Sequence, residues 1–530
     1  MSLPVIHTLA HLLHENVRRH PQRNCLTDGS RRFSYAEFWQ EVRVCAKSFH
    51  ALGIKKGDRV ALLMGNQSEW LVVNFAVTML GGVLVTLNTW WRADELHHAL
   101  SLTDPKVLVL VDRYLGNDYI KILDRLGTLE RVSSALKQVV CLGDILPAHA
   151  LSWFKFRTAG ASIPSEVIDR AMSEVRPTDD AMILFTSGST AKSKGVPLKH
   201  AGLVENMHAI GDRMHLSEQD RLILFISLFW GFGLNAALAF ISHGASIVLQ
   251  YRHDIAETLR LIETEQCTGI YATPNIVHEL YAHPDRKLRN LSSLRTGEAR
   301  SNVVHLLHEI GAREVCTMYG LTEGYANSTV SDGRSALEIR QKTVGPALPG
   351  TEVQVIDPVT RVPLPQGEVG EVRIRGYVTE GYCKRADLTA QVIDAEGWFY
   401  TGDLAVLDAE GRLDIRGRLK EMIKTGGISV TPADVENLLL QVPGVAQAVV
   451  VGVPDRERDE VVVAMVVLSE GSSATVESLA QHCRQSAAAY KVPRYIKVVN
   501  LDDMPLTLTG KVHKSKVQEL LSAGYNASMQ

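Results

Sequence analysis

Residues 182–195 read MILFTSGSTAKSKG, an apolar run that passes directly into a loop of hydroxyl, glycine and lysine residues. A short apolar run bounded by turn residues is typical of a buried strand. Backbone N–H groups and hydroxyls in a loop at the end of a strand can surround phosphate oxygens, and lysines add positive charge. The segment therefore favours a phosphate-binding loop on an α/β sheet, although a solvated surface turn has a similar composition. Its spacing differs from the GxxxxGK[ST] pattern of a Walker A loop.

Further apolar, strand-like runs lie on both sides of this segment, and helical patterns separate some of them. Helical patterns at residues 70–80 and 93–102 separate apolar, strand-like runs. These runs lie at residues 59–65, 83–87, 106–111, 182–185, 222–226, 246–250 and 269–272. Strands that alternate with helices predict mainly parallel sheets covered on both faces.

The pattern changes in the last third of the chain. Short alternating strands at residues 352–356 and 371–375, between Gly and Pro turns, predict a small antiparallel sheet or barrel. A further unit begins near residue 420. Its elements are a helix at 432–441, strands at 446–452 and 460–468, and a helix at 476–489, which together predict a compact α+β module.

Composition excludes several classes of protein. The chain has 530 residues, which is longer than a domain with one hydrophobic core normally is. Its 45% hydrophobic and 22% charged residues are typical of globular proteins. A net charge of -3 provides no electrostatic footprint for nucleic acid. The seven cysteines are scattered without a CxxC pair, which argues against disulfides and structural zinc. With no signal-peptide pattern at the N-terminus, a reducing cytoplasm is the expected location.

One apolar stretch is long enough to span a bilayer. Residues 222–241 contain no charged residue. However, Ser227, Gly231, Gly233 and Asn235 interrupt the stretch. This pattern favours a buried strand, a glycine loop and a buried helix over a transmembrane span.

The loop and five further segments resemble the signature motifs of one family, the adenylate-forming superfamily of acyl-CoA synthetases, luciferases and peptide-synthetase adenylation domains. The loop is similar to [ST]SG[ST]TGxPKG, with Ala191 in place of Gly and Ser193 in place of Pro. The other similar segments follow in the family's order: MYGLTE at 318–323, YTGD at 400–403, GRLKE at 417–421, the glycine-rich stretch with Gly426, Gly427 and Val430, and PLTLTGK at 505–511. Asp459 stands where a glycine is frequent in the family.

This resemblance, closest to acyl-CoA synthetases, implies a fold and an activity. The implied fold is α/β: a large N-terminal domain over residues 1–419 with two mainly parallel sheets flanked by helices. A small β-barrel-like subdomain at about 340–416 belongs to this domain, and a small mobile α+β domain follows over 420–530, with Lys420 at the hinge. The implied reaction joins a carboxylic acid and ATP, with Mg²⁺, into an acyl-adenylate and pyrophosphate. The acyl group then passes to CoA and AMP is released.

The resemblance also assigns roles to individual residues. Lys511 would bridge the substrate carboxylate and the α-phosphate, Thr322 would contact phosphate, and Glu323 would bind Mg²⁺, which prefers carboxylates. Tyr319 would lie against the adenine, and Asp403 would accept hydrogen bonds from the ribose. The full set of expected nucleotide- and CoA-binding residues is Thr186, Ser187, Gly188, Ser189, Thr190, Lys194, Gly297, Glu298, Ala299, Tyr319, Gly320, Asp403, Arg418, Lys420, Gly426 and Gly427.

The expected acyl pocket follows from family position and is rich in aromatic residues. Its members are Phe229, Trp230, Phe232, Gly233, Asn235, Tyr271, Tyr325 and Ala326. Bulky aromatics shorten or flatten a cavity, which favours a small, cyclic, aromatic or medium-chain acid. Ordinary core packing is the alternative for this aromatic run.

Other activities of the same family stay open at this point. The chain is an alternative candidate for loading an acyl-carrier protein, for oxidising its adenylate with O₂, or for binding a nucleotide without catalysis. The intact Lys511, Glu323 and Asp403 argue against the non-catalytic alternative. We expect a carboxylic acid, ATP and CoA as partners, no nucleic acid and no membrane span, and the resemblance also allows a homodimer.

Overall fold

The computed structural model describes residues 7–127, 132–186, 192–425, 428–455, 457–507 and 512–528. It divides the chain into two compact units. The first consists of residues 1–353 and 374–399, and the second of residues 354–373 and 400–530. The second unit thus includes residues well before position 420, beginning with residue 354. The role of Lys420 as a functional boundary stays a prediction.

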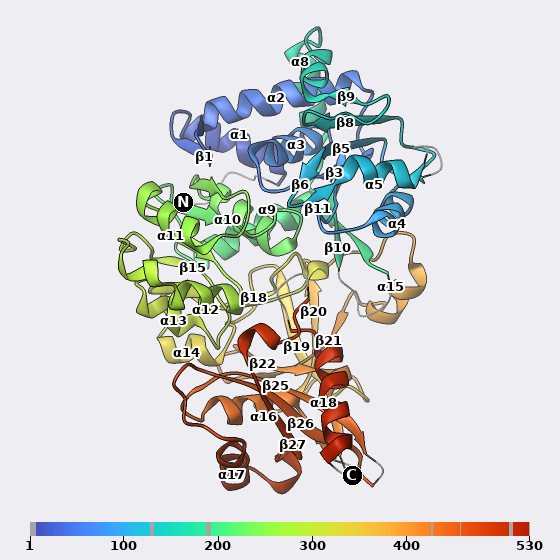
Figure 1. Ribbon diagram of the computed structural model, residues 1–530. Helices are drawn as coiled ribbons and strands as arrows, with labels where there is room; N and C mark the ends of the chain where they lie inside the picture. Colours follow the sequence, from blue (N-terminus) through green and yellow to red (C-terminus); the bar gives the residue numbers. More distant parts are fainter. Residues whose placement is uncertain are drawn as a thin grey trace. The chain divides into compact units, whose positions relative to one another are not determined.

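Two seven-stranded sheets form the frame of the first unit (Figure 1). One contains the predicted strands β3 (Arg59–Leu63), β4 (Val83–Thr86), β5 (Val107–Val111) and β10 (Asp180–Thr186). With β8 (Gln138–Leu142), β9 (Leu151–Ser152) and β11 (Lys194–Lys199), its order is β11-β10-β4-β3-β5-β8-β9. The other contains the predicted strands β12 (Arg221–Leu224), β13 (Ser246–Leu249) and β14 (Gly269–Tyr271). With β1 (Asn24–Asp28), β2 (Arg31–Ser34), β15 (Thr296–Glu298) and β16 (Glu314–Cys316), its order is β16-β15-β14-β12-β13-β1-β2. All pairs in both sheets are parallel except β10 with β11 and β1 with β2. The expectation of two mainly parallel sheets is confirmed.

Buried helices cover these sheets. In α3 (Ser68–Met79), every residue but Glu69 is buried, because α1 (Leu9–Arg19) and α2 (Tyr35–Ala51) pack on it. The apolar residues 222–241 fold into β12, a loop and the buried helix α10 (Gly231–Ser242), as expected. No helix in the described part of the chain is long and apolar enough to cross a membrane.

The last part of the second unit is an α+β module, as predicted. Its central strands are β25 (Val445–Asp455) and β26 (Asp459–Leu468), with β27 (Tyr495–Val499) parallel to β26. Alternate residues of β26 face opposite layers: Val462, Ala464 and Val466 pack with α16 (Pro432–Leu440) and α17 (Val476–Ser486). Val461, Val463, Met465 and Val467 pack with α18 (Lys514–Ser528). Burial on both faces explains why β26 is apolar throughout.

The β-rich segment forms a four-stranded sheet in the order β19-β20-β21-β22. Its strands are β19 (Thr351–Ile356), β20 (Gly370–Gly376), β21 (Phe399–Leu407) and β22 (Leu413–Arg418).

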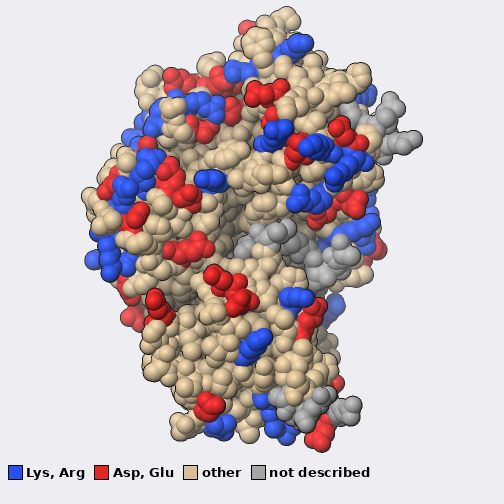
Figure 2. Space-filling view, in the orientation of Figure 1, with Lys and Arg blue, Asp and Glu red and all other residues tan. Residues whose placement is uncertain are grey.

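On the face of the molecule in Figure 2, basic and acidic side chains are interspersed. This mixture agrees with the nearly balanced formal charge.

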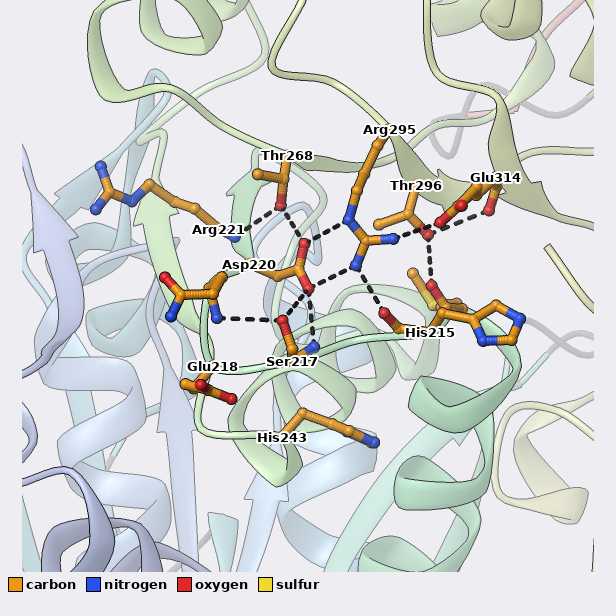
Figure 3. Close-up of polar contacts among 12 residues, drawn as sticks. His215, Ser217, Glu218, Asp220, Arg221, His243, Thr268, Arg295, Thr296 and Glu314 are labelled. Atoms are coloured by element: carbon orange, nitrogen blue, oxygen red, sulfur yellow. Dashed lines mark hydrogen bonds and ion pairs between the residues drawn. The ribbon is translucent and has the colours of Figure 1, made fainter. Parts of the chain in front are cut away.

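A buried ion pair joins the strands of the second sheet at their amino ends (Figure 3). Asp220, just before β12, is 2% exposed, and Arg295, just before β15 (Thr296–Glu298), donates to both of its carboxylate oxygens at 2.6 and 3.0 Å. Arg295 also lies 2.6 Å from Glu314, the first residue of β16 (Glu314–Cys316). Thr268 Oγ1 donates to Asp220 at 2.7 Å. Ligands in sheets of this kind bind at the carboxyl ends, so we assign this network to stability.

We expect Arg295→Ala to lower the free energy of unfolding by about 3 kcal/mol, because Asp220 would stay buried without its cation. This value is at the low end for buried pairs because the Arg295 side chain is 32% exposed. Arg334→Ala is the matched control, since Arg334 pairs with Glu314 from an exposed position and is expected to contribute less than about 1 kcal/mol. Urea unfolding of both variants measures the difference, and equal losses would contradict the assignment.

Candidate functional site

The two described ends of the phosphate-loop segment lie on paired antiparallel strands. Thr186, the last residue of β10, pairs with Lys194, the first residue of β11 (Lys194–Lys199). The intervening Ser187, Gly188, Ser189, Thr190 and Ala191 lie outside the described residues. The buried Thr186 hydroxyl has no hydrogen-bond partner within the described residues. An unpartnered hydroxyl and a lysine at the two ends of this loop fit an anionic ligand.

Glu323 is linked to strand β11 through the side chain of Tyr382. It is buried in the short 3₁₀ helix η2 (Thr322–Gly324), and its Oε1 accepts a hydrogen bond from the Tyr382 hydroxyl at 2.7 Å. Lys194 Nζ lies 4.3 Å from the centre of the Tyr382 ring. Burial and the nearby Glu323 carboxylate raise the pKa of Tyr382, so its hydroxyl stays a donor. A buried carboxylate beside the phosphate-loop ends is the type of ligand that Mg²⁺ takes together with phosphates.

The MYGLTE segment begins with the short strand β17 and then makes a tight turn. Tyr319 ends β17 (Met318–Tyr319), which pairs with β18 (Thr329–Val330). A Cβ on Gly320 would lie 2.1 Å from the Ala326 carbonyl oxygen, so glycine is required there. Tyr325 and Ala326 both have left-handed backbone angles, with φ of 57° and 74°. Such strain in consecutive non-glycine residues is frequent at functional sites.

This turn is fixed to strand β11. The Tyr325 hydroxyl accepts a hydrogen bond from the backbone N–H of Lys199, the last residue of β11, at 2.9 Å. Asn206 Nδ2, in α9 (His200–Arg213), donates to the Tyr325 carbonyl at 3.2 Å. These contacts join residues that follow two predicted motifs, more than a hundred positions apart in the chain.

Glu298 lies at the carboxyl end of β15, opposite Tyr271 at the end of β14. Its neighbour Gly297 has φ of 145°, and a Cβ there would lie 1.8 Å from the Ile270 carbonyl oxygen. Ala299 is fully buried. Burial raises the pKa of Glu298 to about 8, against a slight lowering by Arg300. The carboxyl group is therefore protonated at neutral pH and able to donate a hydrogen bond.

As the pH rises from about 4.5 to about 8, we expect the free energy of unfolding of the wild-type protein to fall relative to that of Glu298→Gln. In this window the folded chain keeps the Glu298 proton while the unfolded chain releases it, so the stability falls as the pH rises. The expected slope is at most about 1.4 kcal/mol per pH unit. Urea unfolding of both proteins across this range measures it. A constant difference would show that folding does not shift the pKa of Glu298.

Five of the eight expected acyl-pocket residues form two groups of contacting side chains. In the first, Trp90 packs edge-on against Phe229 and Trp230, with ring centres 5.7 and 4.9 Å apart. In the second, Phe232 and Tyr271 have ring centres 5.3 Å apart, and the Tyr271 hydroxyl lies 3.3 Å from Asn235 Oδ1.

Both groups depend on α10 and the loop before it. Phe232 and Asn235 are three residues apart on α10 and therefore share a helix face. A Cβ on Gly233 would lie 2.4 Å from the Ser227 carbonyl oxygen, which explains the glycine. The Asn235 amide nitrogen is buried and has no partner within the described ranges. Phe229, Tyr271 and Asn235 are buried, whereas Trp230 and Phe232 are only partly covered.

The second unit carries its own part of the expected site. Asp403 of β21 lies opposite Arg418 of β22, and Arg418 Nε is 2.9 Å from the Asp403 carboxylate. Asp403 is buried, but the Arg418 side chain is 54% exposed and can turn toward solvent. Lys420 follows in the 3₁₀ helix η3 (Leu419–Glu421), with its side chain exposed. Gly426, Gly427 and Lys511 lie outside the described residues.

A lysine that the sequence analysis missed fixes the chain just beyond Lys511. Lys514, the first residue of α18, lies 2.9 Å from Glu421 and 3.4 Å from Glu436. Burial lowers the pKa of Lys514, but the two carboxylates outweigh it and raise the pKa. The lysine therefore stays charged and ties the start of α18 to η3 and α16.

The departure at position 459 has a backbone explanation. Asp459 begins β26 after the turn from β25 and has φ of 71°. Glycine adopts this angle without strain, and aspartate is among the few other residues that tolerate it. The position thus keeps the conformation that favours glycine.

Sequence reasoning missed three residues of the candidate site: Tyr382, Trp90 and Lys514. Local sequence patterns do not indicate these three residues, because their contacts join distant parts of the chain. The structure places η2, which carries Thr322 and Glu323, against the strands that carry Thr186 and Lys194, and it brings Asp403 and Arg418 into contact. Their roles toward ATP stay predictions.

Comparison with known proteins identifies the family. The AMP-binding enzyme model matches residues 13–383, and the AMP-binding enzyme C-terminal domain model matches residues 434–511. The chain is 31% identical to the medium-chain acyl-CoA ligase ACSF2 of Danio rerio, over 97% of this chain and 88% of that protein. It is 34% identical to the 3-[(3aS,4S,7aS)-7a-methyl-1,5-dioxo-octahydro-1H-inden-4-yl]propanoyl:CoA ligase of Mycobacterium tuberculosis, over 97% and 99%.

Solved structures agree with these relatives. The crystal structure of ATP-bound MatB from Rhodopseudomonas palustris superposes with a TM-score of 0.83 at 26% identity, covering 97% of this chain and 99% of that one. Acyl-CoA synthetases of this family use ATP, Mg²⁺ and CoA, and Thr186, Lys194 and the buried Glu323 are groups of the kind that MgATP requires. The chain belongs to the AMP-binding enzyme family, as an AMP-forming carboxylate–CoA ligase.

Proposed function

We propose that this ligase activates a hydrophobic carboxylic acid of small to medium size, with a cyclic, aromatic or medium-chain acyl group. The observation that carries this proposal is a set of contacting aromatic side chains: Trp90, Phe229 and Trp230 in one group, and Phe232 with Tyr271 in the other. Flat, rigid side chains favour an apolar ligand of limited size. The names of the relatives support the same range, from a medium-chain acid to a bicyclic propanoate.

The chemistry requires two anions to meet. The carboxylate oxygen attacks the α-phosphorus of ATP, the bond to the bridging oxygen breaks, and pyrophosphate leaves. We assign the neutralisation of this charge to Lys511 and the phosphate contacts to Thr186–Thr190, Lys194 and Thr322. Glu323 would hold Mg²⁺, which neutralises phosphate charge when bound. Such a site acts mainly by positioning and electrostatic stabilisation.

The second half-reaction needs a different arrangement at the same carbonyl. The CoA thiolate attacks the acyl carbon of the adenylate, and the bond to the AMP phosphate oxygen breaks. Lys511 would stand in the path of the thiol, so we propose that the C-terminal module rotates about Lys420 after the first step. Asp403 and Arg418 would keep the ribose in place during both steps, and Gly426 and Gly427 would line the path of the pantetheine arm.

An acid panel scored by AMP formation tests this proposal. Purified enzyme with MgATP is assayed with and without CoA, against linear acids of increasing length, aromatic acids and cyclic alkanoic acids. We expect turnover with CoA for hydrophobic acids of medium size, and little for acetate or for amino acids. Activity confined to short polar acids would contradict the proposed lining. Transfer to a carrier protein that exceeds transfer to CoA would support the alternative acceptor.

Two expectations about the context belong to this proposal. All seven cysteines are free, which favours a reducing compartment such as the cytoplasm. The homodimer also stays a prediction, which sedimentation of the purified protein measures.

A further inference from the structure

Two histidines and an aspartate converge outside the nucleotide and acyl regions. His208 and Asp212 are four residues apart on α9, and His243 follows the end of α10. His243 Nε2 lies 3.2 Å from Asp212 Oδ1, and His208 Nε2 lies 3.7 Å from the same oxygen. The ligand atoms of all three residues lie within 4.8 Å of one another.

Both ring nitrogens of His243 have polar neighbours, since Nε2 lies 3.2 Å from Asp212 Oδ1 and Nδ1 lies 3.0 Å from the Ser242 hydroxyl. Its Nδ1 also lies 3.1 Å from the Ala239 carbonyl oxygen, which can only accept, so the tautomer with the proton on Nδ1 satisfies this carbonyl. In that tautomer Nε2 carries a lone pair on the side of Asp212, where a bound ion would lie between the two groups. Histidines that bind metals usually donate their other N–H to a carbonyl or carboxylate in this way, which fixes the tautomer and the ring orientation.

The residues around the three side chains allow the two imidazole rings to pack closely against α9. A Cβ on Gly211 would lie 2.3 Å from His243 Cε1, so only glycine allows the imidazole to pack against α9 at this point. The His208 and His243 rings are stacked with centres 4.4 Å apart. His243 is nearly buried, at 9% exposure, whereas the Asp212 side chain is 65% exposed and open to an ion from solvent.

The spacing of the ligand atoms suits a small ion. Zn²⁺ binds imidazole nitrogen and carboxylate oxygen at about 2.0–2.2 Å, so two ligands of a tetrahedral ion lie about 3.3–3.5 Å apart. The separations of 3.2 and 3.7 Å from Asp212 bracket this range, and the ligand nitrogens of the two histidines lie within 4.8 Å of each other. Because the rings are stacked, His208, which is 25% exposed, must turn about its Cβ–Cγ bond to point its lone pair at the same ion.

We propose that His208, Asp212 and His243 form a binding site for a divalent transition-metal ion, such as Zn²⁺ or Co²⁺, separate from the Mg²⁺ site at Glu323. Two imidazoles with one carboxylate prefer such ions over Mg²⁺, which takes oxygen ligands. The ion would fasten the last turn of α9 to the end of α10, the helix that carries Phe232 and Asn235. Its expected role is therefore to stabilise this part of the acyl-binding region.

Metal binding by tag-free, chelator-treated protein tests this site in the absence of ATP and acid. Titration with Zn²⁺ against a chromophoric chelator is expected to give one high-affinity site per wild-type chain. His208→Gln, Asp212→Asn and His243→Gln are each expected to weaken it at least about tenfold. Zn²⁺ is also expected to raise the unfolding temperature of the wild type and not of these variants.

Two variants serve as matched controls. His253→Gln removes another histidine paired with a carboxylate, Glu279, and Glu323→Gln removes the proposed Mg²⁺ ligand. Both are expected to bind Zn²⁺ like the wild type. The proposal is overturned if the wild type has no high-affinity site, or if the three site variants in folded form, checked by circular dichroism in chelator, retain wild-type affinity. Neither result bears on adenylation, which is assayed separately with Mg²⁺.

Discussion

Replacing Lys511 with alanine is expected to slow adenylate formation by a factor on the order of 10²–10³. The lysine would supply positive charge where the substrate carboxylate meets the α-phosphate, and this charge matters most in the transition state. An interaction made only in the transition state lowers kcat, so we expect KM for ATP to change little. Acid-dependent exchange of labelled pyrophosphate into ATP measures this half-reaction alone.

Lys516→Ala is the matched control for this experiment. Lys516 is a nearby exposed lysine that pairs with Glu519 in the first turn of α18. We expect this control to keep pyrophosphate exchange within about twofold of the wild type, because exposed ion pairs contribute little. Equal rates for Lys511→Ala and the wild type, with both proteins folded, would contradict the role assigned to Lys511.

The change Lys420→Pro is expected to separate the two half-reactions. Proline fixes φ near -65°, so it restricts the backbone rotation that a hinge residue must absorb. Adenylate formation is expected to stay within a few-fold of the wild type, whereas thioester formation from adenylate and CoA falls by a factor on the order of 10², since small misplacements of reacting groups have effects of this size. Single-turnover assays of each step measure the two rates.

Lys420→Ala separates the backbone effect from the side chain. The Lys420 side chain is exposed in η3, so its removal is expected to leave thioester formation close to the wild-type rate. Similar losses in both half-reactions for Lys420→Pro would indicate general damage and count against the hinge. A loss in Lys420→Ala as large as in Lys420→Pro would assign the effect to the lysine side chain.

The sequence predicted the central strands of the first unit well, because both faces of β3, β4 and β5 are buried and their apolar runs are unbroken. Strand β11 was missed. Its sequence, KGVPLK, reads as a loop, yet it pairs with β10 along its whole length. Pro197 is tolerated there because β11 is the edge strand of its sheet.

The candidate site was predictable only where residues belong to continuous motifs. Glu323 was found through the segment MYGLTE, whereas its partner Tyr382 lies 59 positions away in an unremarkable stretch. Trp90 contacts Phe229 and Trp230 only because the loops after β4 and β12 meet in the folded unit. Contacts of this kind are set by the arrangement of the strands, which local sequence patterns do not encode.

Transfer of labelled oxygen tests most directly the central claim that the acid attacks the α-phosphate of ATP. The best acid from the panel is prepared with ¹⁸O in both carboxylate positions and turned over with MgATP and CoA. If the carboxylate attacks the α-phosphate, AMP acquires one ¹⁸O atom and the acyl-CoA keeps the other, as mass spectrometry of both products shows. AMP without label, or ADP as the nucleotide product, would contradict the account.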